Sequence, residues 1–251
     1  MSQPIELYFW PTPNGRKISI ALEEMELPYI LKPVAIGKGE QFKPDFLAIS
    51  PNNRMPAIVD PDGPDGKPIS VFESGAILQY LGRKTGKFYP SDERKRVEVD
   101  EWLIWQVANV GPMFGQASHF KNYAPNLVDD PGQIAYAVAR YNNEVNRLLG
   151  VLERRLNGRD FIAGEYTIAD MAAYPWVKIA GVFDQDMSNF PNVQAWIERL
   201  AARPAVQKGA AIGAELRKPP PPPGSAEQRE AAKALFGQTA ASVTAAIKGA
   251  S

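Results

Sequence analysis

The sequence contains no cysteine and a single histidine, His119. Without cysteine the chain has no disulfides, zinc–thiolate sites or iron–sulfur clusters, and no catalytic thiol of its own. One histidine excludes a histidine-rich metal site and any mechanism that needs two imidazoles. Its position near a predicted helix end favours a cap or a surface residue over a catalytic base. We therefore expect no metal ion in this protein.

Charge excess and long hydrophobic runs are also lacking. The 28 basic residues balance 28 acidic ones, whereas a nucleic-acid-binding protein normally carries a basic excess that neutralises phosphates. No apolar run approaches the roughly 18 residues of a membrane span, and the N-terminal segment has neither the basic region nor the apolar stretch of a secretion signal. These absences predict a soluble, cytoplasmic protein that binds neither nucleic acid nor membranes.

The composition is that of an ordinary globular protein. The chain has 251 residues, of which 45% are hydrophobic and 22% charged, enough for one large or two small domains. Short apolar runs bounded by turn-forming residues predict strands at residues 5–9, 29–34, 57–59 and 70–72. Helical patterns lie at residues 18–25, 44–49 and 74–85. This order predicts one mixed sheet with helices packed on it.

Strand patterns end near residue 90, and helical patterns follow. They lie at residues 92–120 (disturbed at Gly111-Pro112), 134–156, 168–180, 193–202 and 205–216. We therefore expect an α/β domain over 1–89 and an all-helical domain over 90–217. Beyond them, over 218–251, five prolines (219–223) predict an extended linker. Residues 226–248 predict a helix whose thin apolar stripe docks loosely or frays.

Polar groups at element boundaries mark candidate sites in the first domain. In PTPNG (11–15), Thr12 or Asn14 can cap the following helix, and the free N–H groups there favour an anion. In NNRMPAIVD (52–60), a Met55-Pro56 bond before a strand has the setting of a cis bond. In FESG (72–75), Ser74 suits a helix cap and Glu73 a partner of the helix dipole. Taken one at a time, PTPNG and FESG are better explained by capping alone, and only about 5–6% of X–Pro bonds in folded proteins are cis.

The order and spacing of these segments resemble the thioredoxin-like domain of glutathione transferases. In the second domain, FIAGEYTIADMAAYPWV (161–177) resembles the helix-starting motif of that family, physically a capping box of Thr167 and Asp170. Together with GKGEQF (37–42) and WQVANVGPMFGQ (105–116), the motifs resemble the nu class, which includes bacterial disulfide-bond oxidoreductases and fungal nitrogen-regulator relatives. The resemblance covers about residues 4–215 and implies a thioredoxin-like α/β domain followed by an all-α domain.

The resemblance also implies that glutathione is the co-substrate. Glu73 and Ser74 would hold its γ-glutamyl group, and the backbone of Met55, before Pro56, would pair with its cysteinyl amide. The remaining contacts would come from Gln41 to the glycyl end, from Thr12 and Asn14 to the sulfur, and from Arg140 across a homodimer interface. An alternative for Arg140 is a solvated residue on the polar side of its helix. The segment 102–105, with its two tryptophans, is compatible with a buried dimer seam.

Activation of the glutathione thiol is the chemistry this set of residues suits. A free thiol has a pKa near 8.5, and lowering it by about two units requires about 2.7 kcal/mol of preference for the anion. A hydroxyl donor contributes about 1.5–3 kcal/mol and a helix terminus about 0.3–2 kcal/mol, so Thr12 and the helix behind it suffice. The turn holds no tyrosine or cysteine, and Tyr8 lies within the strand as a core candidate.

The predicted function is disulfide reduction or transfer of glutathione to an electrophile. The sequence does not distinguish the two reactions, because both use the same thiolate. An aromatic-rich pocket between the domains would favour flat apolar substrates, including aryl ethers, although aromatic residues at helical spacing also suit a core. The predicted pocket residues are Trp10, Phe114, His119, Phe120, Tyr123 and Tyr174. The rival hypothesis is a non-catalytic binding or regulatory module. A metal or nucleotide enzyme lacks the necessary ligands and phosphate loop.

Overall fold

A four-stranded mixed sheet forms the first part of the molecule. The computed structural model describes residues 3–217, 222, 225–241 and 243. The strands are β1 (Ile5–Phe9), β2 (Tyr29–Pro33), β3 (Ala57–Asp60) and β4 (Ile69–Phe72), in the spatial order β2-β1-β3-β4. β1 pairs in parallel with β2, and the other two pairs are antiparallel. The predicted parallel unit followed by a hairpin is thereby confirmed.

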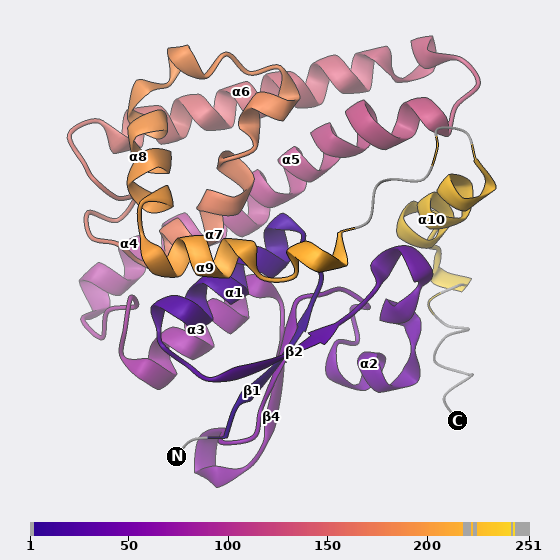
Figure 1. The fold of residues 1–251 in the computed structure, drawn as a ribbon. Helices are drawn as coiled ribbons and strands as arrows, with labels where there is room; N and C mark the ends of the chain where they lie inside the picture. The colour runs from indigo at the N-terminus through magenta and orange to yellow at the C-terminus, as the bar shows by residue number, and fades with distance from the viewer. Residues whose placement is uncertain (1–2, 218–221, 223–224, 242, 244–251) are drawn as a thin grey trace.

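Three helices accompany the sheet: α1 (Pro13–Glu24), α2 (Pro44–Ile49) and α3 (Ser74–Thr85). α1 begins where Thr12 caps the helix and Pro13 fixes the first helical φ angle. α3 ends at Gly86, which adopts the left-handed conformation with φ 67°. α1 and α3 pack against each other and lie between the sheet and the helical part of the chain (Figure 1).

The rest of the described chain is helical, as predicted. The helical pattern predicted at residues 92–120 is continuous in the structure. It consists of α4 (Glu93–Trp105), a π turn η4 (Gln106–Val110) and α5 (Gly111–Ser118), and the π turn lies directly before the predicted disturbance. A second π turn, η5 (His119–Tyr123), continues α5. The later helices are α6 (Ala135–Leu156), α7 (Ile168–Val177), α8 (Pro191–Ala201) and α9 (Pro204–Ala211). Among the described residues, no helix is both long enough and apolar enough to cross a membrane.

Close packing joins α9 to α1. A Cβ added at Gly209 would lie 2.6 Å from the Ile20 Cα and 2.7 Å from its backbone nitrogen, so only glycine permits this approach. Beside the contact, the buried Glu24 carboxylate accepts two hydrogen bonds from Arg203, at 2.6 and 2.8 Å. α7 also packs on α1 and begins at the predicted capping box of Thr167 and Asp170. α1 is thus fixed by helices that follow it by more than 140 residues in the sequence.

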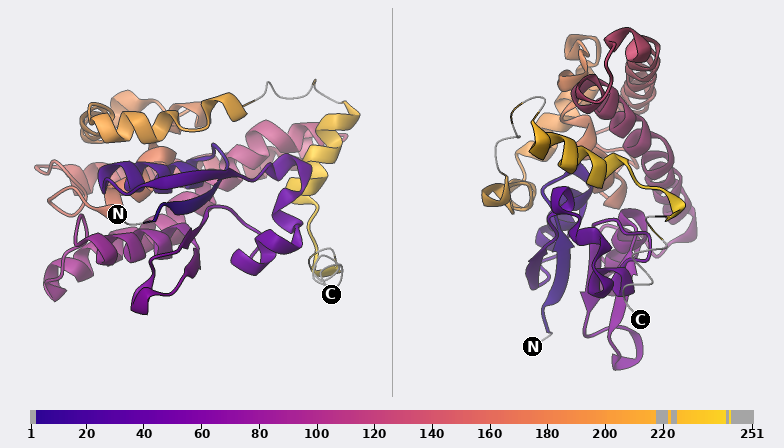
Figure 2. Two further views of the ribbon diagram at one scale, coloured as in Figure 1. Left: turned by 60° about the horizontal axis from the view of Figure 1, so that its bottom comes forward. Right: turned by 90° about the vertical axis from the view of Figure 1, so that its right-hand side faces the viewer.

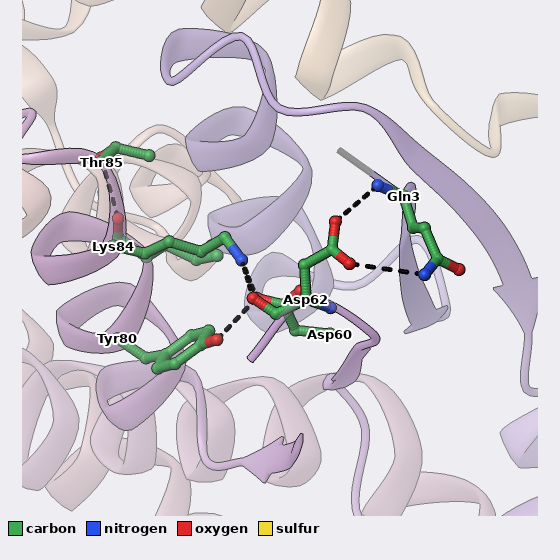
Figure 3. Close-up of polar contacts among 7 residues, drawn as sticks. Gln3, Asp60, Asp62, Tyr80, Lys84 and Thr85 are labelled. Atoms are coloured by element: carbon green, nitrogen blue, oxygen red, sulfur yellow. Dashed lines mark hydrogen bonds and ion pairs between the residues drawn. The ribbon is translucent and has the colours of Figure 1, made fainter. Parts of the chain in front are cut away.

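A polar network fixes the far end of α3 to the sheet (Figure 3). The buried Asp60 carboxylate, at the end of β3, accepts hydrogen bonds of 2.6 Å from both the Tyr80 hydroxyl and the Lys84 ammonium group. Lys84 also donates to the Asp62 carbonyl, and the Asp62 carboxylate accepts from the backbone of Gln3. The C-terminal half of α3 is therefore held to the sheet, and the helix begins directly after β4.

The C-terminal extension differs from the prediction of one helix over 226–248. α10 spans Ala226–Phe236 and ends at Gly237, because Gly237 and Thr239 are poor helix formers at this point. Of the two expected outcomes, docking is the one observed, because α10 packs on η1 (Ile36–Lys38) and buries Ala232. The end of the predicted helix, including Ile247, and most of the proline run lie outside the described residues. The proposed division at residues 89 and 217 remains a prediction.

Candidate functional site

A cleft of about 150 Å³ lies where the N-termini of α1 and α3 meet the loop before β3. Its lining residues are Asn14, Arg54, Met55, Pro56, Glu73 and Ser74. All except Arg54 were predicted from the three boundary segments. The exposed Arg54 adds a cation to the cleft. The Met55-Pro56 peptide bond is cis, which confirms that prediction.

Thr12 lies at the entrance to α1 with its hydroxyl group in a specific orientation. The hydroxyl oxygen accepts a hydrogen bond of 3.2 Å from the Gly15 backbone N–H. Its proton points to the Met55 sulfur, 3.6 Å away. A thioether is a weak acceptor, so an anionic sulfur placed in the cleft would compete for this donor effectively.

Asn14 is oriented by the helical part of the molecule. Its Oδ1 accepts a hydrogen bond of 2.9 Å from the Trp176 indole N–H. Since that indole group only donates, the oxygen of the Asn14 amide must face it. The NH₂ group of Asn14 therefore remains as the donor that a ligand in the cleft can use.

The start of α3 corrects one detail of the sequence prediction. Glu73 occupies the N-cap position with a left-handed φ of 68° and no capping hydrogen bond from its side chain, which instead accepts from Asn52 at 3.1 Å. Ser74 is the first helical residue, so the prediction that it caps the helix is wrong. A non-glycine residue held at positive φ is a strained conformation typical of functional sites. Glu73 and Ser74 both line the cleft, so the N-terminus of α3 lies at it.

Beneath Ser74 lies Lys17, a residue that the sequence analysis missed. Its side chain is buried, and its ammonium group donates to the Ser74 hydroxyl at 3.2 Å and to the Gln106 amide oxygen at 2.7 Å. Burial lowers the pKa of Lys17 to about 7, and the nearby Glu73 carboxylate partly opposes that shift. Because Lys17 occupies a lone pair of the Ser74 oxygen, the hydroxyl proton of Ser74 is free to be donated to a ligand.

Three of the predicted site residues, Thr12, Gln41 and Arg140, do not line the cleft. Thr12 lies next to it, with its hydroxyl oxygen 3.6 Å from the sulfur of the lining residue Met55. Gln41 is buried in η2 (Glu40–Phe42), and its amide oxygen has no hydrogen-bond partner within the described part of the chain. Arg140 lies exposed on α6, where its guanidinium group pairs with Glu144 at 3.4 Å. The predicted role of Arg140 across a dimer interface stays a prediction.

The six predicted pocket residues divide into three groups. Phe114 and Tyr174 are only 1% and 3% exposed and belong to the hydrophobic core, which corrects their assignment to a pocket wall. Trp10 is half-buried after β1, and Phe120 stacks on Tyr141 of α6 with ring centroids 5.4 Å apart.

His119 and Tyr123 form an aromatic cluster with Phe236 of α10. The ring centroids of His119 and Phe236 are 4.4 Å apart, and those of Tyr123 and Phe236 are 5.0 Å apart. Burial lowers the pKa of His119, because it disfavours the charged form of the imidazole. No group of three or more acidic or histidine side chains in the described residues could hold a metal ion.

Comparison with known proteins gives consistent similarities. Residues 12–84 match the family model "Glutathione S-transferase, N-terminal domain", and residues 125–204 match "Glutathione S-transferase, C-terminal domain". The chain is 50% identical over 203 residues to the disulfide-bond oxidoreductase YfcG of Escherichia coli (strain K12), covering 80% of this chain and 92% of YfcG.

Two solved structures are similar along most of the chain. A glutathione transferase from Pseudomonas putida, with one glutathione disulfide bound per subunit, has 42% identity and a TM-score of 0.78, covering 83% of this chain and 91% of that one. A glutathione transferase from Burkholderia graminis, with two glutathione molecules bound per subunit, has 45% identity and a TM-score of 0.78, covering 83% of this chain and 88% of that one.

Proposed function

Because the chain belongs to the glutathione S-transferase family, we propose that it is a glutathione-dependent enzyme that reduces disulfide bonds. The observation that carries the proposal is the orientation of Thr12. Its hydroxyl accepts from the Gly15 N–H and directs its proton at a weak acceptor, at the N-terminus of α1. A thiolate at that position would gain a hydrogen bond and the favourable end of the helix dipole.

The cleft suits the polar groups of the tripeptide. The γ-glutamyl carboxylate would accept from the Ser74 hydroxyl and the first N–H groups of α3, and its ammonium group would face Glu73. The backbone of Met55, beside the cis Pro56, would pair with the cysteinyl amide. Arg54 lines the same cleft and offers a guanidinium group to the glycyl carboxylate. The Gln41 amide would bind the glycyl carboxylate through its NH₂ group. Its amide oxygen cannot serve, because the oxygen and the carboxylate are both hydrogen-bond acceptors.

Thr12 and Asn14 would activate the thiol of the bound glutathione. The hydroxyl of the first and the NH₂ group of the second would stabilise the glutathione thiolate, which lowers the pKa of the thiol by about two units. Since the sequence has no cysteine, no sulfur of the protein takes part in the exchange.

Disulfide reduction then proceeds in two exchanges. The bound thiolate attacks one sulfur of R–S–S–R, which forms a glutathione mixed disulfide and releases RS⁻, which takes up a proton. A second glutathione thiolate attacks the glutathione sulfur of that mixed disulfide, which forms glutathione disulfide and releases the second RS⁻. Two glutathiones are oxidised for each disulfide reduced. The same thiolate would serve for transfer to electrophiles such as aryl ethers.

We also propose a homodimer, with its interface on α4. Val97 and Ile104 are 47% and 57% exposed on this helix, and Trp102 and Trp105 are in edge contact beside them. Arg140 would reach the partner's cleft only in that assembly. Light scattering that gives a monomer would contradict both parts of this proposal.

The proposed activity is tested by parallel assays with a glutathione mixed disulfide, an aryl halide and an aryl ether. We expect turnover of the disulfide to exceed that of the other two substrates. Calorimetric titration with glutathione distinguishes the proposed enzyme from the rival regulatory module. Binding of glutathione without turnover of any of the three substrates supports the regulatory module. No binding at millimolar glutathione contradicts the proposed site altogether.

A further inference from the structure

The segment between β2 and β3, residues 34–56, packs around a small hydrophobic core of its own. This core consists of Val34, Phe46 and the adjoining Ala57, with Ile36, Ile49 and Met55 packed on them. The main core of the described residues is a separate and much larger cluster. Because so few apolar side chains are buried in the small core, local opening of this segment costs less free energy than opening of the main core. The segment nevertheless carries Gln41 and Arg54, the two side chains proposed for the glycyl end of glutathione.

A turn over residues 50–54 connects this segment to the cleft. The Asn53 N–H donates to the Ser50 carbonyl at 2.9 Å, and the Ser50 hydroxyl donates to the Arg54 carbonyl at 2.8 Å. Asn53 has a left-handed φ of 49°, which asparagine adopts more readily than most residues. The residues on either side of it reach the site, because Asn52 donates to the Glu73 carboxylate at 3.1 Å and Arg54 lines the cleft. The position of this turn therefore sets the position of Arg54.

The C-terminal extension contacts the segment at two points. α10 packs on η1 with Ala232 buried, and a Cβ added at Gly37 would lie 3.9 Å from the Ala231 Cβ. Directly after α10, the Gln238 amide oxygen accepts a hydrogen bond of 3.1 Å from the side chain of the buried Asn53. The NH₂ group of Gln238 donates to a carbonyl of α10 itself at 3.0 Å, which orients the amide. The extension thus joins the start of the segment to the turn before the cleft.

The extension is also anchored on the helical part of the molecule. The Phe236 ring contacts the His119 ring of η5, with centroids 4.4 Å apart. η5 continues α5, whose Phe114 and Ala117 belong to the main core. The right-hand view of Figure 2 shows α10, in yellow, crossing between the helical part and the segment before β3. The extension lies beyond residue 204, where the match to the family model ends, and it connects the small core to the large one.

We propose that the C-terminal extension positions the glycyl half of the glutathione site, by fixing residues 34–56 against the helical part before the ligand binds. This inference rests on the proposed function. Asn53 and Gln238 are positioning residues, because they act through the neighbouring Arg54. A ligand that meets an ordered segment gains affinity, since the free energy of ordering is not subtracted from binding. The γ-glutamyl half is less dependent on the extension, because Lys17 holds the Ser74 hydroxyl from the side of α1.

Two ligands separate the halves of the site without relying on turnover. S-Methylglutathione carries the glycyl residue, whereas S-methyl-γ-glutamylcysteine lacks it and keeps the γ-glutamyl group. For Gln238→Ala we expect the ratio of their affinities, longer over shorter ligand, to fall about 2- to 10-fold, the range of one hydrogen bond. Glu230→Ala, at an exposed position of α10, is the matched control and should keep the wild-type ratio.

Ala232→Glu provides the second variant, because it places a carboxylate in the contact between α10 and η1. It should lower the ratio at least as much as Gln238→Ala. Hydrogen exchange should show faster exchange of the amide groups of residues 36–54 in this variant, with those of α6 unchanged. An unchanged ratio in both variants, or an equal loss of affinity for both ligands, would overturn the proposed role. If the wild-type protein binds neither ligand, the proposed glutathione site itself is contradicted.

Discussion

Replacement of Lys17 tests the electrostatics of the cleft most sharply. At pH 7.5, a lysine with a pKa of about 7 is about one quarter protonated. An anion bound at Ser74 should raise that pKa and draw a proton onto the lysine. We therefore predict that S-methylglutathione, which has no thiol proton to release, takes up protons when it binds.

The magnitude follows from the geometry. The Lys17 Nζ lies 3.2 Å from the Ser74 oxygen, and an O–H···O bond adds about 2.7 Å, which places a bound carboxylate within about 6 Å of Nζ. At an effective dielectric constant of about 20, the attraction is about 2.8 kcal/mol, or about two pKa units. The ligand's ammonium group near Glu73 offsets part of this attraction. A net rise of about one unit gives uptake of about half a proton at pH 7.5.

Isothermal titration in buffers of different ionisation enthalpy measures this uptake. Lys17→Met should abolish it, whereas Lys95→Met, at an exposed position on α4, should not change it. The free energy of unfolding supplies an independent readout. Because the folded-state pKa of Lys17 lies below the ordinary lysine value of 10.5, the unfolded chain binds more protons above pH 7. The free energy of unfolding should therefore increase with pH above 7, by up to about 1.4 kcal/mol per pH unit. In Lys17→Met this pH dependence should be absent. Equal proton uptake by wild type and Lys17→Met would refute the reasoning.

Three further predictions concern the framework and the thiol. Gly209→Ala should destabilise the protein by about 1–3 kcal/mol in urea unfolding, because the added methyl group meets the Ile20 backbone; an unchanged midpoint would contradict the close approach. Asp170→Ala should cost at least about 3 kcal/mol in the same assay, since its buried carboxylate accepts from Ile162, Thr167 and Trp196; a loss below about 1 kcal/mol would show that the network is dispensable. Thr12→Val should lower disulfide turnover strongly while leaving the affinity for glutathione nearly intact, and unchanged turnover would remove Thr12 from the mechanism.

Local patterns predicted the elements of the fold well, because each is encoded by neighbours in the sequence. The helix of residues 74–85 and the capping box at Thr167 agree with the structure. Lys17 escaped prediction because it adjoins an apolar stripe on α1, and its burial comes from Ser74 and Gln106, which are far away in the sequence. No local signal distinguishes such a lysine from a solvated one.

The errors in the pocket have the same physical origin. Helical spacing shows that Phe114 and Tyr174 face something apolar, but it does not distinguish the core from a pocket wall. Conversely, the thin apolar stripe of the extension gave no indication that Phe236 meets His119, because that contact joins residues more than 100 positions apart. Contacts of this kind depend on the tertiary fold.

The central claim is that Thr12 and the N-terminus of α1 make the bound sulfur anionic at neutral pH. Ultraviolet difference absorption of the glutathione thiolate, titrated against pH in the complex, measures this directly. The account predicts a thiol pKa about two units below the free value of about 8.5, restored most of the way in Thr12→Val. A bound thiol that stays protonated at pH 7, or an equal pKa in the two proteins, would contradict it.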